Sequence, residues 1–204
     1  MKTFFSIDID YWNRLSDHGL VAKNLKKLSE ACEKHNVKIT AVTNHQQMLP
    51  LVNEFQPDQL INIDDHSDLA DNTVEKLECG TWISYVKNRN KSKYKWIHRC
   101  VSEDGCCNGG SVFKGLKRVN FKPYGNKIEW AKVVNEQTDK VDFDFDKIIN
   151  KEGVREVCVC MSPSYSDEHI RKSFRKWVKD HNVPFKKGRK RENNFRRISP
   201  PKVK

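Results

Sequence analysis

The sequence predicts an α/β protein in which a mainly parallel sheet lies between two layers of helices, a three-layer α/β/α arrangement. Three short apolar segments rich in β-branched residues have the character of buried strands. Amphipathic segments of helical length separate them. Strands that alternate with helices pair in parallel, because each helix carries the chain back to the same end of the sheet.

The first half of the chain shows this alternation most clearly. The expected strands are residues 3–9, 37–42 and 60–63, and the expected helices are residues 20–35 and 48–55. In the first helix Leu20, Leu25 and Leu28 share one stripe, and lysines lie opposite. Pro57 marks the end of the second helix, since proline cannot continue a helical ladder.

The second half is less regular. Residues 87–95 are basic and predict a loop, residues 102–111 contain two glycine turns, and residues 154–161 return to strand character. Ser164 or Ser166 then caps a helix that runs to about residue 180. That helix has acids in its first turn, Asp167 and Glu168, and an apolar stripe formed by Ile170, Phe174, Trp177 and Val178.

The positive charge is concentrated at the carboxyl terminus. The chain has a net charge of +11, but residues 186–204 contain nine Lys or Arg and one acid, which leaves +3 for the rest. The composition therefore predicts a domain of residues 1–184 and a basic tail of residues 185–204 with little fixed structure. Such a tail can make weak, salt-sensitive contacts with nucleic acid phosphates, or can act only as a solubilising or localising segment.

Cysteine usage and the lack of apolar segments predict the compartment. No apolar run approaches the length of a membrane span, and the amino terminus has no signal-peptide pattern. The seven cysteines form no C-x-x-C pair, and their odd number favours reduced thiols. We therefore expect a cytoplasmic protein with no membrane partner. Cys158 and Cys160 fall in an apolar run and are expected to be buried as small hydrophobes.

Acids and histidines stand at the carboxyl ends of the three expected strands. The first strand ends in a D-x-D motif, a histidine follows the second, and a D-x-H-x-D motif follows the third. The residues concerned are Asp8 and Asp10, His45, and Asp64, His66 and Asp68. An extended chain points alternate side chains the same way, and ligands bind at the carboxyl edge of parallel sheets. We therefore expect these six side chains to form one site.

The residue types of this site predict metal ions. Four carboxylates at one sheet edge would repel one another, so that some would stay protonated, and burying an unpaired charge is costly. Two divalent cations remove both problems. Carboxylate oxygens with a minority of imidazole nitrogens suit Mn²⁺, and Zn²⁺ or Fe²⁺ also fit. Two cations a few ångströms apart can activate a shared hydroxide, so we expect a binuclear centre.

The motifs resemble those of a known superfamily. Residues 64–68 resemble the D-x-H-x-D signature of the arginases (the ureohydrolase superfamily). Together with residues 44–50 (Asn-His-Gln-Gln-Met-Leu-Pro), they are similar to an arginase-like family that includes the peptide arginases. Residues 79–83 resemble that family's next motif, with Thr81 in place of its usual Asn, and residues 6–12 are similar to its D-x-D motif with two trailing aromatics. Residues 88–156 have no counterpart in this resemblance.

The resemblance implies an arginase/deacetylase-like fold and a hydrolase that releases urea from an arginine side chain in a peptide or from a small guanidino compound. The implied bridging ligands are Asp64 and Asp8, with His45 and Asp68 on one cation and His66 and Asp10 on the other. A bridging hydroxide, oriented by Asp68, would attack the guanidinium carbon.

Recognition of the substrate needs a further acid, since guanidinium groups bind carboxylates in bidentate fashion. Glu78, beside the motif at residues 79–83, is the candidate for this catalytic-site role, and its other interpretation is a surface acid. Trp82 either walls the pocket or belongs to the core. His98 is a candidate proton shuttle on residue type alone.

The order of the motifs departs from that of the family. There the D-x-D segment follows the D-x-H-x-D segment, whereas here it stands at the amino terminus. A circular permutation explains the difference, because the order of strands along the chain need not fix their position in the sheet. Residues 142–146 (Asp-Phe-Asp-Phe-Asp) lie in the family's order, but they predict an exposed edge strand. We prefer Asp8 and Asp10, because a ligand-bearing strand should be buried.

Three other functions compete with this one. A phosphatase of the haloacid dehalogenase class would use Asp8 and Asp10, but it has a small residue where Trp12 stands and leaves His45 and His66 unexplained. A deacetylase-like amidohydrolase would use one zinc ion and fewer acids. A nucleic-acid-binding protein would act through residues 186–204.

Overall fold

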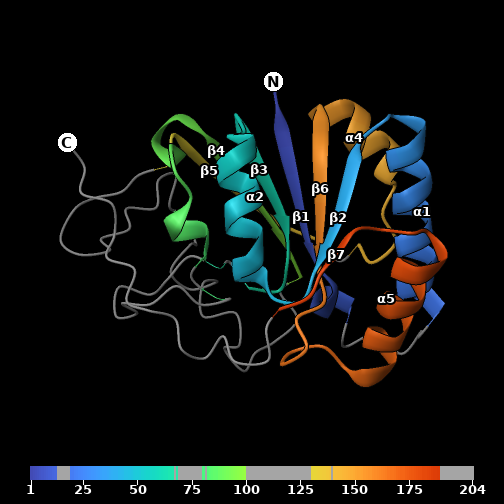
Figure 1. Cartoon of the computed structure of the whole chain (residues 1–204). Helices are drawn as coiled ribbons and strands as arrows, with labels where there is room; N and C mark the ends of the chain where they lie inside the picture. Colours follow the sequence, from blue (N-terminus) through green and yellow to red (C-terminus); the bar gives the residue numbers. More distant parts are fainter. Residues whose placement is uncertain are drawn as a thin grey trace.

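The computed structural model describes residues 1–12, 19–66, 68, 80, 82–99, 130–138 and 140–188. Within these residues seven strands form one parallel sheet in the order β5-β4-β3-β1-β6-β2-β7 (Figure 1). The strands are β1 (Thr3–Asp8), β2 (Lys38–Val42), β3 (Gln59–Ile63), β4 (Lys93–His98), β5 (Lys132–Gln137), β6 (Val154–Cys160) and β7 (Phe185–Lys186). The predicted parallel sheet is confirmed, and β1 lies at its centre.

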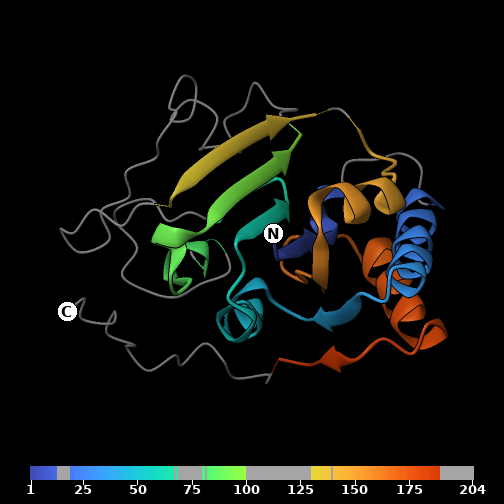
Figure 2. The same cartoon turned by 90° about the horizontal axis from the view of Figure 1, so that it is seen from above.

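Helices cover both faces of this sheet. They are α1 (Gly19–Lys34), α2 (Met48–Phe55), α4 (Phe145–Glu152) and α5 (Glu168–Asp180). Helices α1, α4 and α5 pack on one face, and α2 packs on the other (Figures 1 and 2). Successive side chains of β1 point to opposite faces of the sheet. Phe5 and Ile7 pack in the core beside α1, whereas Phe4 packs in the core beside α2. The chain therefore adopts the predicted three-layer arrangement.

The alternation of elements predicted for the first half of the chain is confirmed. Each of the three strands and two helices begins and ends within one residue of its predicted bounds. The strand predicted at residues 154–161 is also present, as β6. These elements are the ones whose apolar pattern is uninterrupted, and they are buried on one or both faces.

Strand register brings the ends of four strands to one level. Ile7 of β1 pairs with Ile63 of β3. On the other side of β1, Asp8 pairs with Cys160 of β6, and Cys160 in turn pairs with Val42 of β2. Because the strands are parallel, the residues that follow β1, β2, β3 and β6 emerge at the same edge of the sheet, the lower edge in Figure 1.

The loop predicted for residues 87–95 is wrong at its end. Strand β4 begins at Lys93, and its alternate residues Tyr94 and Trp96 are buried against α2's side of the sheet. The intervening Lys95 is only half-buried, and its ammonium lies 2.8 Å from Glu136 of β5. The basic residues hid a strand whose lysines face outward or pair across strands, and β5 beside it was not predicted at all.

Two boundaries near the carboxyl end also differ from those predicted. Helix α5 starts after Asp167, whereas Ser166 donates its hydroxyl to the carbonyl of Met161 at 2.6 Å. The domain boundary predicted after residue 184 falls inside the sheet, because Phe185 and Lys186 pair with β2 as strand β7. Residues 189–204, which include most of the predicted basic tail, lie outside the described residues.

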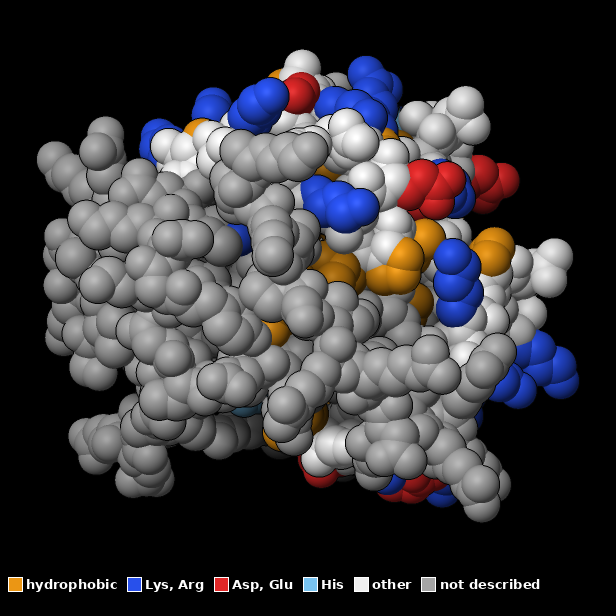
Figure 3. All heavy atoms as spheres, turned by 60° about the vertical axis from the view of Figure 1, so that its left-hand side comes forward, with side chains coloured by type: hydrophobic (Ala, Val, Ile, Leu, Met, Phe, Trp, Pro, Cys, Tyr) orange, Lys and Arg blue, Asp and Glu red, His pale blue; other side chains and the backbone are white. Residues whose placement is uncertain are grey.

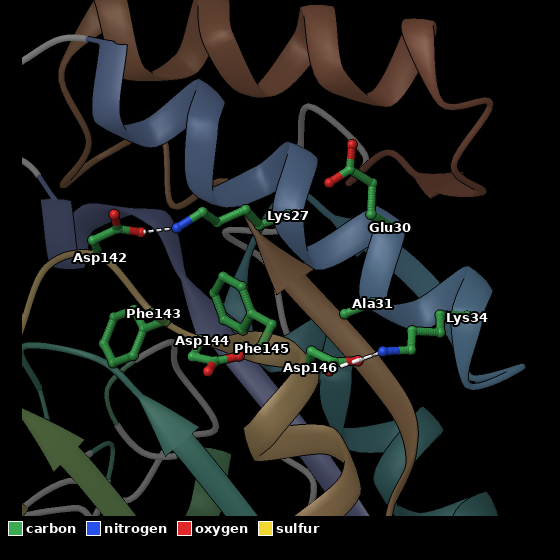
Figure 4. Close-up of a pocket in the computed structure, with 9 residues that line it drawn as sticks. All are labelled: Lys27, Glu30, Ala31, Lys34, Asp142, Phe143, Asp144, Phe145 and Asp146. Atoms are coloured by element: carbon green, nitrogen blue, oxygen red, sulfur yellow. Dashed lines mark hydrogen bonds and ion pairs between the residues drawn. The ribbon is translucent and has the colours of Figure 1, made fainter.

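The edge strand predicted for residues 142–146 does not form. Asp144 instead caps α4, its carboxylate accepting the backbone N–H of Lys147 at 3.0 Å. Phe143 and Phe145 are buried in the core beside α1. The flanking acids form ion pairs of 2.5–2.9 Å with lysines of α1. Asp142 pairs with Lys27 and Asp146 with Lys34 (Figure 4), and Asp142 also pairs with Lys23. This segment therefore docks α4 against α1, with two of its carboxylates paired with lysines and the third capping α4.

Charge on the described surface is mixed. Lys and Arg side chains are spread among acidic and apolar ones on the face in Figure 3. None of the described helices is long and apolar enough to cross a membrane. The turns predicted at residues 102–111 lie outside the described residues.

Candidate metal centre

All six predicted ligand residues lie at the carboxyl edge of the sheet. Asp8 is the last residue of β1, and Asp10 lies in the 3-10 turn η1 (Ile9–Trp12) that follows it. His45 opens η2 (His45–Gln47) after β2. The remaining three, Asp64, His66 and Asp68, follow β3. Five of the six are buried, whereas the side chain of His66 is 44% exposed and forms the rim.

Short hydrogen-bonded turns shape the two acidic motifs. The Asp8 carboxylate accepts the backbone N–H of Asp10 at 3.1 Å, and the Asp64 carboxylate accepts the backbone N–H of His66 at 2.8 Å. Each aspartate thus closes a turn with the residue two positions later. The extended geometry predicted for these motifs is therefore wrong. Their side chains converge because the chain bends immediately after each strand.

A glutamine fixes the turn that carries His45. The side-chain oxygen of Gln47 accepts the backbone N–H groups of Thr43 and Asn44 at 3.0 and 2.8 Å. These bonds hold the chain in the η2 turn directly after β2. Residues 44–47 therefore form a turn that places the His45 imidazole near the ends of the strands.

The ligand atoms form two groups that share Asp64. In the first, His45 Nδ1 lies 2.7 Å from Asp68 Oδ2 and 3.3 Å from Asp64 Oδ2. In the second, His66 Nδ1 lies 3.4 Å from Asp64 Oδ1 and 3.6 Å from Asp10 Oδ2. Within each group, one ligand atom from each residue lies within 4.8 Å of the others. Asp64 presents one carboxylate oxygen to each group, which is the arrangement of a bridging ligand.

Asp8 lies beside the first of these groups. Its Oδ2 is 3.3 Å from His45 Nδ1, and it also accepts a hydrogen bond from the hydroxyl of Ser162. Ser162 follows β6 and has a φ of 42°, in the left-handed region that non-glycine residues seldom adopt. The strained backbone at Ser162 turns its hydroxyl toward the end of β1. Strand β6 thus supports the ligand set from between β1 and β2.

Burial and mutual repulsion act on the carboxylates of the cluster. Burial raises the pKa of Asp8 well above its ordinary value, and the charge of Asp10 raises it further. Burial also raises the pKa of Asp10 and of Asp64, to which the charges of Asp64 and Asp68 respectively add. Without a cation, therefore, these acids release their protons at a higher pH than ordinary aspartates do.

The two imidazoles are held in the protonated form by the same acids. Burial lowers the pKa of His45, but the charges of Asp8 and Asp68 outweigh burial, so that its pKa stands well above the ordinary value. The nearby carboxylates of Asp10 and Asp64 raise the pKa of His66 to about 12. Protons on the histidines thus occupy the place that metal cations would take in this cluster.

Unsatisfied polar atoms and donor types both fit divalent cations. Both carboxylate oxygens of Asp10 and the Nε2 atom of His45 are buried and form no hydrogen bond with the described residues. Buried polar atoms in this state are rare, and a bound cation would account for them. Oxygen donors with two imidazoles match Mn²⁺ and also accommodate Zn²⁺ or Fe²⁺.

Tryptophan N–H groups hold the segment after β3. The indole N–H of Trp82, in η3 (Trp82–Tyr85), donates to Asp68 Oδ2 at 2.5 Å, and that of Trp96 donates to the carbonyl of Asp64 at 2.8 Å. Trp82 is buried in the core beside α2, and its ring lies 5.6 Å from that of His45. It therefore belongs to the core, as one of its two predicted roles requires, and it also donates to a predicted ligand, which was not predicted.

Trp82→Phe is expected to lower the affinity for divalent cations about tenfold, because Asp68 would lose the donor that orients it. Isothermal titration with Mn²⁺ measures the change. Trp177→Phe is the matched control, since the Trp177 indole donates to Ser29, away from the cluster, at 2.7 Å. Equal affinities in the two variants would contradict the orienting role of Trp82.

The structure places His98 away from this cluster. His98, the predicted proton shuttle, ends β4, stacks on Trp96 and lies 2.6 Å from the side-chain oxygen of Asn135. Its contacts are thus with the β4–β5 side of the sheet. Glu78, the predicted guanidinium partner, lies outside the described residues, as does the motif residue Thr81.

The residues that β6 brings to this cluster were not predicted as site residues. Cys160 was predicted to be only a small buried hydrophobe, and Ser162 was not singled out. The signal was present, because residues 154–161 were predicted as a buried strand, and in a parallel sheet the residues after any buried strand can reach the same edge. The sequence does not indicate that β6 lies beside β1.

Comparisons with known proteins name no relative. The chain matches no protein-family model, and searches of curated proteins and of solved structures each found no significant match. The resemblance to the arginase-like family therefore stays a prediction that depends on the motifs and on the ligand geometry. The structure of the described residues places the chain in the α/β class with a parallel sheet.

Proposed function

We propose that this protein is a metal-dependent hydrolase with two divalent cations per chain, Mn²⁺ being the expected metal, and that it cleaves a guanidinium C–N bond to release urea. The observation that carries the proposal is the position of Asp64. Its two carboxylate oxygens face two separate groups, one with His45 and Asp68 and the other with Asp10 and His66. A shared carboxylate between two such groups is what a binuclear site requires.

The proposed chemistry divides between the cations and the chain. Two divalent cations held by these residues would supply a hydroxide nucleophile at neutral pH by lowering the pKa of water, and cleavage of the guanidinium C–N bond would leave a protonated amine beside urea. Asp68 would orient the nucleophile, because its carboxylate is fixed by the Trp82 indole and lies 2.7 Å from His45. Five of the six ligand residues are buried, which limits the access of other water to the centre.

The rim of the centre favours a planar cationic substrate. The exposed side of His66 meets the ring of Tyr165 at 5.6 Å, and Tyr165 is 53% exposed. A guanidinium group binds well against aromatic faces, and it also needs a carboxylate, for which Glu78 is our candidate. An arginine side chain within a peptide or protein, or a small guanidino compound, is the proposed substrate.

The alternatives draw less support from the described residues. A phosphatase would use Asp8 as a nucleophile, yet Asp8 is buried, accepts a hydrogen bond from Ser162 and lies beside His45. That mechanism also assigns no role to the group around His66. A nucleic-acid-binding function depends on the basic residues after residue 188, which lie outside the described part of the chain.

Metal content and urea release test the proposal in sequence. Protein purified without chelator or immobilised metal, then reconstituted with Mn²⁺, is expected to retain about two Mn²⁺ per chain after desalting. The loaded protein is then assayed for urea release from arginine-containing peptides, with lysine-containing peptides and chelator-treated protein as controls. Failure to retain metal would overturn the whole proposal. Two retained cations without urea from any guanidino substrate would overturn the reaction and leave the metal centre.

A further inference from the structure

We propose that Cys160 is a seventh metal ligand, and that its thiolate, with Asp8 and His45, makes one of the two cation positions selective for thiophilic divalent metals such as Zn²⁺ over Mn²⁺. The inference rests on the proposed metal centre and adds to it a ligand that the carboxylate and histidine motifs do not contain. It assigns a soft donor to one position and leaves the position around Asp10 and His66 with hard donors.

The sheet places Cys160 between the two strands that carry Asp8 and His45. Strand β6 lies between β1 and β2, and Cys160 is its last residue. Cys160 pairs in register with Asp8 on one side and with Val42 on the other, three residues before His45. Residues paired in parallel strands project to the same face of the sheet, so the thiol lies on the Asp8 side chain's face.

Distances within this group are those of a metal-binding cluster. One ligand atom each from Asp8, His45 and Cys160 lies within 4.8 Å of the others, and all three residues are buried. The thiol itself lies 3.2 Å from the Ser162 hydroxyl and 3.6 Å from the carbonyl of Thr43. These are weak partners for a thiol, and a cation can replace them without breaking any strand pairing.

An unused nitrogen of His45 is the second observation. The Nδ1 atom of His45 lies 3.3 Å from the carboxylates of Asp8 and Asp64 and 2.7 Å from that of Asp68, and its Nε2 atom is buried with no hydrogen-bond partner among the described residues. The imidazole thus has one nitrogen beside the carboxylates and a second that no hydrogen bond uses, in a group that also contains a carboxylate and a thiol. A histidine, a cysteine and an aspartate are ligands that Zn²⁺ accepts in proteins.

The chemistry of the thiol sets the expected selectivity. A coordinating thiol gives up its proton to become a thiolate. Thiolate binds Zn²⁺, Co²⁺ and Cd²⁺ in preference to Mn²⁺, which favours oxygen donors. Ser162 can stay in place throughout, because its hydroxyl already donates to Asp8.

Cobalt substitution tests this assignment directly. Protein loaded with Co²⁺ is expected to show a near-ultraviolet sulfur-to-cobalt charge-transfer band that Cys160→Ser loses. Cys160→Ser is also expected to weaken Zn²⁺ binding about tenfold or more and to leave Mn²⁺ binding nearly unchanged. The matched control is Cys158→Ser, which alters a buried thiol two residues earlier on the same strand and should keep the band.

The possible outcomes separate this inference from the proposed function. Bound Co²⁺ with no sulfur band, or a band that survives in Cys160→Ser, overturns the role of Cys160 and leaves the metal centre standing. Failure to bind any divalent cation overturns both. If Cys160→Ser does not fold, X-ray absorption of the Zn²⁺-loaded Cys158→Ser variant replaces it, with a sulfur neighbour at about 2.3 Å expected and an all-oxygen-and-nitrogen shell overturning the inference.

Discussion

Asp64→Asn is expected to abolish binding of both divalent cations, whereas Asp10→Asn is expected to leave one bound. Asp64 offers Oδ2 to the group with His45 and Oδ1 to the group with His66, so its charge serves both positions. Asp10 belongs to the second group only. Elemental analysis of the reconstituted proteins measures this as a change from about two Mn²⁺ per chain to about none or about one.

Asparagine is the appropriate substitution because it keeps the shape of the side chain and removes the charge. Asp142→Asn is the matched control, since Asp142 is an acid whose partners are Lys23 and Lys27 on the surface of α1, and it should retain both cations. Two cations in Asp64→Asn would show that Asp64 does not bridge. A loss of both in Asp10→Asn would show that the two positions are not independent.

The parts of the fold that could be predicted are those with strong local patterns. β1, β2 and β3 are short runs of apolar residues, and α1 and α2 carry clear stripes, so their bounds follow from burial alone. β4 was mistaken for a loop because it contains two lysines, of which Lys93 is exposed and Lys95 pairs with Glu136. Such pairing is a property of the folded sheet and leaves no local signal.

The candidate site was predictable for a related reason. Strand ends in a parallel sheet meet at one edge, so acids and histidines after buried strands are brought together whatever the order of the strands. The six predicted ligands do converge, although the prediction attributed this to extended alternation. The actual cause is a pair of turns closed by Asp8 and Asp64, which residue spacing alone cannot distinguish from an extended chain.

Contacts between distant segments were beyond prediction from the sequence. Ser162 donates to Asp8 across more than 150 positions of the chain, and Cys160 lies level with Asp8 because β6 happens to occupy the place between β1 and β2. No spacing rule links these residues. Trp82 illustrates the same limit, because its role depends on a hydrogen bond with Asp68 as well as on its burial.

As the pH rises from about 6 to about 8, the free energy of unfolding of the metal-free protein is expected to fall. That of the Mn²⁺-loaded protein is expected to rise over the same range. In the metal-free protein the pKa of His66 is raised from 6.5 to about 12, and that of His45 is raised well above 6.5. A group with a raised pKa in the native state stabilises that state fully below its unfolded pKa and loses this contribution as pH rises toward the native value.

The carboxylates of the cluster change the stability with pH in the same direction as the two histidines. Asp8, Asp10 and Asp64 also have raised pKa values, so the native cluster binds more protons than the unfolded chain over this range. His98 opposes them, because burial lowers its pKa and favours the native state at higher pH. Two histidines and three carboxylates outweigh this one group, which sets the direction of the expected change.

Bound Mn²⁺ reverses the direction. Carboxylates and imidazoles bind a cation only when deprotonated, so the affinity for Mn²⁺ rises with pH, and a ligand that binds only the native state stabilises it by mass action. Urea unfolding at about pH 6 and about pH 8, with excess Mn²⁺ or with chelator, measures both trends. In Asp64→Asn the Mn²⁺ and chelator curves should coincide. A chelated wild-type protein that is more stable at the higher pH would mean that the cluster does not hold the excess protons, and the electrostatic reason for assigning cations to it would then fail.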